Sequence, residues 1–243
     1  MSTSLGFDRP IRAVVIGAGG GIGAALVQRL MADPGVAHVS ACARQPLASG
    51  IGHAQHALDI TDEPSIAAVA STVGAVDLVL VATGLLHGPG IQPEKTWRSI
   101  DPTALMELYR VNAVGPMLVA KHFLPLLPRQ GRSLFAAISA KVGSIEDNRL
   151  GGWYGYRAAK AALNQLLKTA AIELVRTRPD AVVAALHPGT VTTRLSEPFR
   201  GGVSAESLVT PDISANNLLT VLGQLGPADS GGLFAWSGQR LPY

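Results

Sequence analysis

A glycine cluster follows an apolar run in the stretch Val14-Val15-Ile16-Gly17-Ala18-Gly19-Gly20-Gly21-Ile22-Gly23-Ala24-Ala25-Leu26. This order predicts a β-strand that turns tightly into an α-helix. Gly17 permits the turn, Gly21 lets the backbone approach a ligand closely, and Gly23 lets helix and strand pack together. Because a helix N-terminus presents free N–H groups and the positive end of its dipole, we expect an anion there, usually a pyrophosphate. A glycine-rich turn that binds nothing is the alternative interpretation of this stretch alone.

The rest of the chain alternates between strand and helix patterns. Apolar runs predict strands at residues 11–16, 38–43, 53–58, 76–82, 131–139, 181–186 and 232–236. Helical patterns begin near residues 21, 61, 102, 154 and 213, and the two longest cover residues 102–126 and 154–176. We therefore expect one α/β domain over residues 1–243: a Rossmann-like, doubly wound sheet of about seven parallel strands with helices on both faces. In such sheets, ligands bind beyond the carboxyl ends of the strands, where the strand order reverses.

Composition narrows the class of protein. Of the 243 residues, 47% are hydrophobic and 15% are charged, which indicates a large buried core. The net charge of +3 comes from scattered residues, without the basic block that nucleic-acid-binding proteins carry. The single cysteine, Cys42, excludes an internal disulfide and a cysteine-based metal cluster, and we expect no metal site. We expect a cytoplasmic protein without a membrane partner, because the sequence starts with polar residues and has no apolar run long enough to span a bilayer.

Two charged residues follow predicted strands at the edge where a ligand is expected. Arg44 comes after the second strand, where an arginine suits a ribose 2′-phosphate and an acidic residue would suit a 2′-hydroxyl. Asp59 comes after the third strand, where its carboxylate can accept a hydrogen bond from an adenine amine. A solvated surface arginine and an ordinary turn aspartate are about as consistent with these two positions alone.

Tyr156 and Lys160 stand four residues apart in a helical pattern, so they share one helix face. A phenol has a pKa of about 10 and transfers protons poorly at neutral pH unless a cation stabilises its phenolate. A lysine one turn along the helix supplies that charge, so the spacing suits proton transfer to or from a substrate oxygen. An ordinary packing pair is the more frequent explanation of this spacing when it is considered alone.

Taken together, these pieces resemble the short-chain dehydrogenase/reductase family over almost the whole chain, and within it the branch of small carbonyl reductases that includes C-factor-like proteins. The glycine cluster is similar to the family's glycine motif, and the pair at 156 and 160 is similar to its Tyr-x-x-x-Lys motif. Further matches are the helix asparagine of the family's catalytic tetrad and the Pro-Gly segment that contacts the nicotinamide carboxamide. These further matches are Asn112 and Pro188-Gly189-Thr190-Val191-Thr192-Thr193.

The resemblance implies an NADP(H) site, with NAD(H) as a second option, because NADPH-preferring members carry a base where Arg44 stands. Such members often have another basic residue inside the glycine motif, whereas this chain has Gly19 and Gly20 there. Ala82-Thr83-Gly84 stands where the family often has Asn-Asn-Ala-Gly, so this motif is degenerate. The implied cofactor contacts are Gly17, Gly19, Gly20, Gly21, Ile22, Gly23, Arg44, Asp59, Ile60, Ala82, Thr83, Gly84, Lys160, Pro188, Gly189, Val191 and Thr193.

The resemblance also implies a reaction: hydride transfer between the nicotinamide and a small carbonyl or alcohol substrate, such as an aldehyde or a ketone. Tyr156 would donate the proton, and Lys160 would hold the cofactor ribose and lower the pKa of the tyrosine. Asn112 would anchor a water that relays the proton. The protein would supply position and charge, while the hydride chemistry belongs to the cofactor.

One residue departs from the family pattern, because the position of the catalytic serine is occupied by Ala140. We prefer Ser139 as the replacement donor and keep Ser144 as the alternative. Adjacent strand residues face opposite sides unless the end of the strand re-aims one of them, so Ser139 requires such re-aiming. The substitution favours a rival hypothesis, an NADP-binding signalling or interaction protein of the same fold with reduced or lost turnover. The retained Tyr156 and Lys160 favour the enzyme.

Two expectations concern segments rather than single residues. Residues 190–211 form a long connection between a strand and the next helix, which is typical of a lid over a substrate. Similar proteins pair through their two long central helices, so we expect a homodimer or homotetramer formed through residues 102–126 and 154–176.

Overall fold

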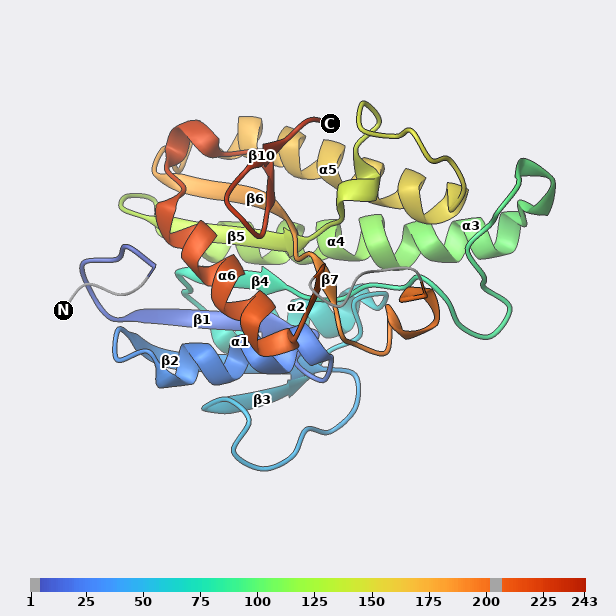
Figure 1. The fold of residues 1–243 in the computed structure, drawn as a ribbon. Helices are drawn as coiled ribbons and strands as arrows, with labels where there is room; N and C mark the ends of the chain where they lie inside the picture. The colour runs from blue at the N-terminus through green and yellow to red at the C-terminus, as the bar shows by residue number, and fades with distance from the viewer. Residues whose placement is uncertain (1–4, 202–206) are drawn as a thin grey trace.

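Eight strands form one sheet in the computed structural model, which describes residues 5–201 and 207–243 (Figure 1). Their order is β10-β9-β6-β5-β4-β1-β2-β3, and all neighbours are parallel except β9 and β10. The strands are β1 (Ile11–Ile16), β2 (Val36–Ala43), β3 (Ala54–Ala57), β4 (Leu78–Val81), β5 (Ser133–Ile138), β6 (Ala181–His187), β9 (Gly232–Ala235) and β10 (Arg240–Leu241). The predicted doubly wound parallel sheet is confirmed, and the antiparallel β10 is an eighth strand that the sequence pattern did not indicate.

Helices cover both faces of this sheet (Figure 1). Two of them, α1 and α6, pack on one face, while α2, α4 and α5 pack on the other. The helices are α1 (Gly21–Ala32), α2 (Glu63–Val73), α3 (Pro102–Tyr109), α4 (Gly115–Phe123), α5 (Tyr154–Leu174) and α6 (Pro211–Gln224). None of the helices within the described ranges is long and apolar enough to cross a bilayer.

The middle of the sheet explains why one predicted strand is apolar throughout. All four residues of β4 are buried, because this strand lies between two helical layers. Leu78 and Leu80 pack into the apolar cluster under α1 and α6. Val79 and Val81 pack into the cluster under α2, α4 and α5. Alternate side chains of β4 therefore belong to the two core clusters on opposite faces of the sheet.

The strand order reverses between β1 and β4, and the glycine turn lies at their carboxyl ends. Gly17 has a φ of +91°, and a Cβ at this position would lie 2.9 Å from the carbonyl oxygen of Ala82. The N–H groups of Gly17 and Ala18 both donate to the carbonyl oxygen of Cys42, at 2.9 and 3.0 Å. The turn thus lies between the ends of β2 and β4. Ligands bind at this edge in sheets of this kind.

The helix predicted over residues 102–126 is interrupted. A π-helical turn, Arg110–Val114, separates α3 from α4, and a 3₁₀ turn at Leu124–Leu126 ends the segment. Pro116 has no N–H to give to the carbonyl four residues earlier, at Asn112. The N–H of Gly115 donates instead to the carbonyl of Arg110, five residues earlier. This wider turn is the physical reason for the break, and π turns are frequent at functional sites.

The segment predicted as a lid, residues 190–211, contains two short strands. These are β7 (Thr190–Val191) and β8 (Leu208–Val209), which pair in parallel apart from the main sheet. A 3₁₀ turn, Glu197–Phe199, lies between them in sequence. Residues 202–206 of the predicted lid lie outside the described residues.

Candidate active site

The predicted cofactor contacts line up along one edge of the sheet. They follow β1 (17–23), β2 (Arg44), β3 (59–60), β4 (82–84) and β6 (188–193). Since the carboxyl ends of parallel strands meet at one edge, these five short segments lie on the same side of the molecule. Most of these contacts were expected from the family resemblance, and Arg44 and Asp59 were expected also from their positions after predicted strands.

The turn from β1 into α1 forms a backbone cradle with no room for a side chain at Gly21 or Gly23. A Cβ on Gly21 would lie 2.9 Å from Cγ2 of Thr193, and a Cβ on Gly23 would overlap the carbonyl oxygen of Gly17. Helix α1 begins at Gly21 with Gly20 as its N-cap, and no side chain caps it. Its first N–H groups therefore suit an external anion such as a pyrophosphate.

A second observation fits a cofactor at this edge. The hydroxyl oxygen of Thr83, just after β4, is buried and has no hydrogen-bond partner among residues 5–201 and 207–243. Buried hydroxyls are normally paired, so this one suits a polar group of a ligand. Thr83 also contacts the glycine turn, since its Cγ2 lies 3.0 Å from where a Cβ on Gly17 would stand. The residues present therefore fit a dinucleotide.

Arg44 and Asp59 lie at the ends of β2 and β3. The Oδ1 atom of Asp59 accepts hydrogen bonds from the backbone N–H and the hydroxyl of Thr61, at 2.8 and 2.7 Å. These bonds, the backbone one first, lower the pKa of Asp59, and the charges of Arg44 and Arg110 lower it further. Asp59 is thus held as a carboxylate that can accept a hydrogen bond. Arg44 is exposed, so its guanidinium is free to meet a phosphate at the surface.

Asn112 lies in the π-helical turn and is fully buried. Its Oδ1 accepts from the N–H of Leu85 at 3.0 Å, and its Nδ2 donates to the carbonyl of Leu85 at 2.7 Å. A Cβ on Gly84 would lie 3.6 Å from Oδ1 of Asn112 and 3.9 Å from Nζ of Lys160. The structure therefore brings the predicted Asn112, Lys160 and Gly84 together beside the end of β4.

Tyr156 and Lys160 lie on the same face of α5, and both are buried. The Lys160 Nζ atom is 5.8 Å from the centroid of the Tyr156 ring and donates to the carbonyl of Ile138 at 2.8 Å. Burial raises the pKa of the Tyr156 phenol and lowers the pKa of the Lys160 amine to about 7. Burial disfavours the charged form of each group, so any nearby charge has a strong effect on both.

The two predicted serines differ, because Ser139 donates its hydroxyl proton within the core whereas Ser144 only accepts. The Ser139 hydroxyl donates to Oδ1 of Asn164 at 2.7 Å in a buried contact. The Ser144 hydroxyl oxygen accepts from the N–H of Asp147 at 3.1 Å. It is Ala140, the residue in the family serine's place, that packs on the apolar cluster containing Tyr156. The role of Ser139 stays a prediction, and this contact with Asn164 argues against it.

The segment after β6 brings Gly189 and Thr193 to the cofactor edge. Gly189 has a φ of +81°, and a Cβ there would lie 3.0 Å from the indole of Trp236. The carbonyl of Pro188 accepts from the hydroxyl of Ser214 at 3.0 Å, which ties this segment to α6. Val191 is buried in β7. Sequence reasoning missed Trp236 as a neighbour, because its contact spans more than forty residues of chain.

Two more residues beside Tyr156 were missed, Glu94 and Trp153. The Trp153 ring packs edge-to-face on Tyr156, with centroids 6.2 Å apart. Glu94 is 5% exposed, and both its carboxylate oxygens accept from the N–H of Gly155 at 3.2 Å. The pair Gly151-Gly152 before Trp153 was the available signal, because both glycines have positive φ. No sequence pattern indicated Glu94.

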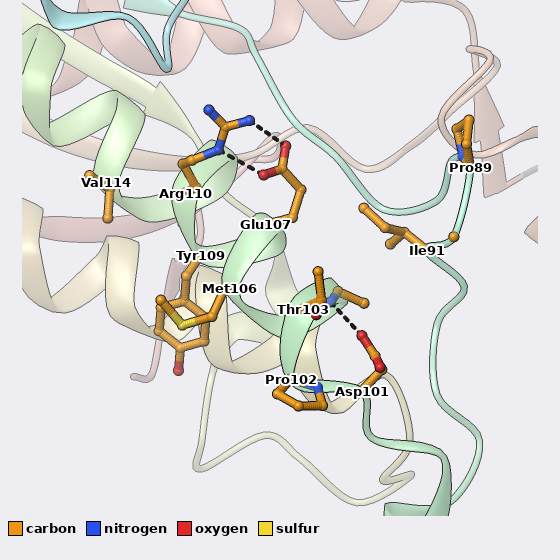
Figure 2. Close-up of a pocket in the computed structure, with 12 residues that line it drawn as sticks. Pro89, Ile91, Asp101, Pro102, Thr103, Met106, Glu107, Tyr109, Arg110 and Val114 are labelled. Carbon is orange, nitrogen blue, oxygen red and sulfur yellow. Dashed lines mark hydrogen bonds and ion pairs between the residues drawn. The ribbon is translucent and has the colours of Figure 1, made fainter.

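A groove of about 790 Å³ lies along the outer face of α3 (Figure 2). Figure 2 shows the Glu107–Arg110 ion pair on the helix and Pro89 and Ile91 on the loop opposite. Tyr156, Lys160 and Asn112 are not among the residues that line it. This groove is therefore separate from the candidate active site.

Comparison with known proteins supports the same assignment of fold. The sequence profile of the family described as short chain dehydrogenase matches residues 12–203. The C-signal protein of Myxococcus xanthus is 34% identical over 145 residues, which cover 59% of this chain and 81% of that protein. A 1-hydroxy-2-glutathionyl-2-methyl-3-butene dehydrogenase of Rhodococcus sp. (strain AD45) is 30% identical over 221 residues, covering 90% and 93%.

Among solved structures, an NADPH-bound carbonyl reductase from chicken fatty liver superposes with a TM-score of 0.84 at 28% identity. The match covers 97% of this chain and 100% of that one. The carbonyl reductase Sniffer of D. melanogaster superposes with a TM-score of 0.82 at 21% identity, over the same shares of the two chains. At that lower identity, the second likeness concerns the fold alone.

Proposed function

This chain belongs to the short chain dehydrogenase family, and from that membership we propose that it is an NADPH-dependent reductase of aldehydes or ketones. The family makes it an NAD(P)-dependent oxidoreductase. One observation carries the finer proposal: Tyr156 and Lys160 lie buried on one face of α5, next to Asn112, at the edge where the strand order reverses. A proton donor and a cation at that edge suit carbonyl reduction.

Bound NADPH supplies the hydride for such a reaction. The residues that fit it are the glycine cradle of β1–α1, the unpaired hydroxyl of Thr83 and the segment after β6. The likeness to a carbonyl reductase described as NADPH-bound, at 28% identity over 97% of this chain, supports the choice of cofactor. Arg44 supports NADPH over NADH, because an exposed guanidinium at the end of β2 can pair with a 2′-phosphate.

Residues of this chain would supply the proton for the reaction. We assign Tyr156 as the group that gives its phenolic proton to the substrate oxygen while the carbonyl carbon takes the hydride. Lys160 holds positive charge near the phenol, which opposes the rise in pKa that burial causes. Asn112 fixes the loop after β4 through its two bonds to Leu85. It would also anchor the water that relays a proton back to Tyr156 after the phenol has given its own to the substrate.

The test is a measurement of NADPH consumption. Purified protein is mixed with NADPH and a panel of small aldehydes and ketones, and the fall in absorbance of the reduced nicotinamide is followed. Turnover of at least one carbonyl substrate that stops with Tyr156→Phe is the expected result. Binding of NADPH without consumption, across the whole panel, would refute the proposal.

A second candidate function rests on Ala140. Alanine stands in the serine position, and the Ser139 hydroxyl proton is donated to Asn164, so neither residue offers a second hydrogen bond to a substrate oxygen beside Tyr156. A protein that binds NADP and signals or interacts through it, with reduced or lost turnover, agrees with that observation. The same NADPH assay separates the two functions, because a binding protein retains affinity for the cofactor without consuming it.

We also propose that two or four copies associate through the regions of α3–α4 and α5. Large apolar side chains are exposed on these regions: Met106 and Val114 near the groove of Figure 2, and Ile172 and Val175 at the end of α5. Another copy of the chain would remove them from water. Sedimentation of the wild type and of a Met106→Glu, Ile172→Glu variant tests this. A wild type that stays monomeric at all concentrations contradicts it.

A cytoplasmic location completes the proposal. Cys42 is a free, buried thiol whose pKa burial raises to about 12, so it suits a reducing compartment and requires no oxidative partner. Cell fractionation followed by immunoblotting checks this location, and recovery in a secreted fraction would contradict it.

A further inference from the structure

Aromatic rings form a continuous chain that begins at the proposed proton donor. Trp153 packs edge-to-face on Tyr156, with ring centroids 6.2 Å apart, and on Phe199, with centroids 5.2 Å apart. His87 then packs edge-to-face on Phe199 at 5.5 Å. Edge-to-face contacts are the favoured geometry for such rings. These three contacts therefore connect the ring of Tyr156 to Phe199 and His87 through Trp153.

The backbone holds Trp153 in an unusual conformation. Its φ is +54°, and it is the one residue other than glycine with a positive φ in the described ranges. Bulky residues adopt this left-handed conformation only when the surrounding structure enforces it, and such strain gathers at functional sites. The Trp153 N–H donates to the carbonyl of Glu94 at 2.5 Å, and its carbonyl accepts from the N–H of Arg157 at 2.9 Å.

The side chain of Glu94 also binds the backbone next to Trp153. Both carboxylate oxygens accept from the N–H of Gly155 at 3.2 Å, at the start of α5. A buried carboxylate needs such partners, and the positive end of a helix stabilises it. A Cβ on Gly155 would lie 2.9 Å from Oε1 of Glu94, so the fit is close. One residue of the loop after β4 thus fixes both Trp153 and the residue that precedes Tyr156.

The positive charge of the neighbouring Arg157 is directed away from the aromatic rings. The Arg157 guanidinium donates to the carbonyls of Gly152 and Val142, at 3.0 and 3.3 Å. Leu195 covers Gly84 from the other side, because its Cδ2 lies 4.0 Å from where a Gly84 Cβ would stand. An apolar cluster of rings next to a proton donor suits an uncharged ring of a substrate and disfavours a charged or very short group.

We propose that Trp153 and Phe199 are specificity-determining residues that hold an uncharged ring of the carbonyl substrate, and that Glu94 is the positioning residue that fixes Trp153. This inference rests on the proposed reductase function. The substrate ring packs against the indole of Trp153 and the ring of Phe199, while its carbonyl oxygen meets the Tyr156 hydroxyl. Phe199 belongs to the short turn Glu197–Phe199, which can shift without unpairing the main sheet.

The first test compares two aldehydes, benzaldehyde and propanal, in NADPH-dependent reduction. We expect the wild type to prefer benzaldehyde in kcat/KM by roughly tenfold or more, with the difference in KM. Trp153→Ala should remove most of this preference, whereas Trp153→Phe should keep much of it. Trp97→Ala is the matched control, because Trp97 is exposed and stacks on Arg98 elsewhere. Equal use of both aldehydes by the wild type, or an unchanged preference in Trp153→Ala, would overturn the inference.

The role of Glu94 is tested by one conservative variant and one variant that removes the carboxylate. Glu94→Gln keeps an oxygen that can accept from Gly155, so it should keep the benzaldehyde preference. Glu94→Ala removes that acceptor and should raise the KM for benzaldehyde several-fold more than the KM for propanal. If each variant changed the KM values for benzaldehyde and propanal by the same factor, Glu94 would have a merely structural role. That result would overturn the positioning assignment.

A measurement without turnover keeps this inference separate from the reductase proposal. Benzyl alcohol is titrated into the NADP-loaded protein while tryptophan fluorescence is recorded. A change in emission that Trp153→Phe abolishes and Trp97→Phe retains is expected. If no aldehyde is reduced but this signal persists, the reductase proposal fails and the ring site stands. If aldehydes are reduced but benzyl alcohol leaves the emission of Trp153 unchanged, the ring site fails and the reductase proposal stands.

Discussion

The hydroxyl of Ser139 donates a 2.7 Å hydrogen bond to the side-chain oxygen of Asn164, in the buried space between β5 and α5. This bond uses the one proton that the hydroxyl carries. Ser139→Ala leaves the Asn164 oxygen without its donor inside the core. We expect the free energy of unfolding to fall by about 1–3 kcal/mol, as measured by urea denaturation, with turnover close to wild type. A large loss of turnover at unchanged stability would make Ser139 the donor after all.

Ala140→Ser restores a hydroxyl at the position that packs on the Tyr156 cluster. A second donor at a developing oxyanion is worth about 10²–10³ in rate, so we expect a clear rise in kcat for any accepted aldehyde. Steady-state kinetics measure it, and a fall in kcat in Ser144→Ala would identify Ser144 as the alternative donor. Unaltered turnover in Ala140→Ser would mean that the site reduces carbonyls without a second hydroxyl.

Tyr156→Phe keeps the ring and removes only the phenolic oxygen. We expect kcat to fall by orders of magnitude while NADPH affinity, measured by calorimetric titration, stays within a few-fold of wild type. Tyr154→Phe is the control, because Tyr154 is exposed two residues earlier on the same helix. If Tyr154→Phe abolished turnover while Tyr156→Phe retained it, the catalytic assignment would be wrong.

Arg44→Asp reverses the charge at the end of β2. A charge-assisted bond to a 2′-phosphate contributes about 1.5–3 kcal/mol, so NADPH should bind at least tenfold more weakly. NADH binding should be unchanged or improved, because aspartate can accept from a ribose hydroxyl. Arg129→Asp makes the same charge change at an exposed site before β5, at the opposite edge of the sheet. Equal affinity of the wild type for both cofactors contradicts this role of Arg44.

Stability of the cofactor-free protein should depend on pH through Lys160. Burial lowers the pKa of this amine from 10.5 to about 7, so between these values the unfolded chain binds the proton that the folded chain releases. Unfolding free energy should therefore rise with pH from about 7 to 10.5, relative to Lys160→Met, which lacks the group. Thermal unfolding of both proteins across that range measures the difference. If the stability of the wild type and of Lys160→Met changed in parallel with pH, Lys160 would stay protonated in the folded state.

The sequence predicted most of the sheet because its signals are local. The central strands, such as β4 and β6, are short apolar runs, and the glycine cluster marks the turn at Gly17, where a positive φ is required. Tyr156 and Lys160 were found by a spacing within one helix. Asn112 is different: it was found by resemblance alone, and the π-helical turn that holds it depends on Pro116 and on the contact of Gly115 with Ile60.

The remaining features depend on contacts between distant segments. Ser139 continues the alternation of β5, and its N–H still pairs with the carbonyl of Leu186, so nothing re-aims its hydroxyl toward Tyr156. The sequence allowed both outcomes, because a strand end can bend. Glu94 meets Gly155 across some sixty residues of chain, and a single acidic residue in a loop gives no warning of that.

The two outer strands of the sheet also limit how copies of this protein can meet. β3 has four residues and β10 has two, with Pro242 directly after β10. Such short edges offer little unpaired backbone to another strand, and proline has no N–H to extend a ladder. Edge-to-edge growth into fibrous aggregates is therefore disfavoured even at high concentration. Self-association is left to the helical surfaces, where side chains rather than backbone select the partner.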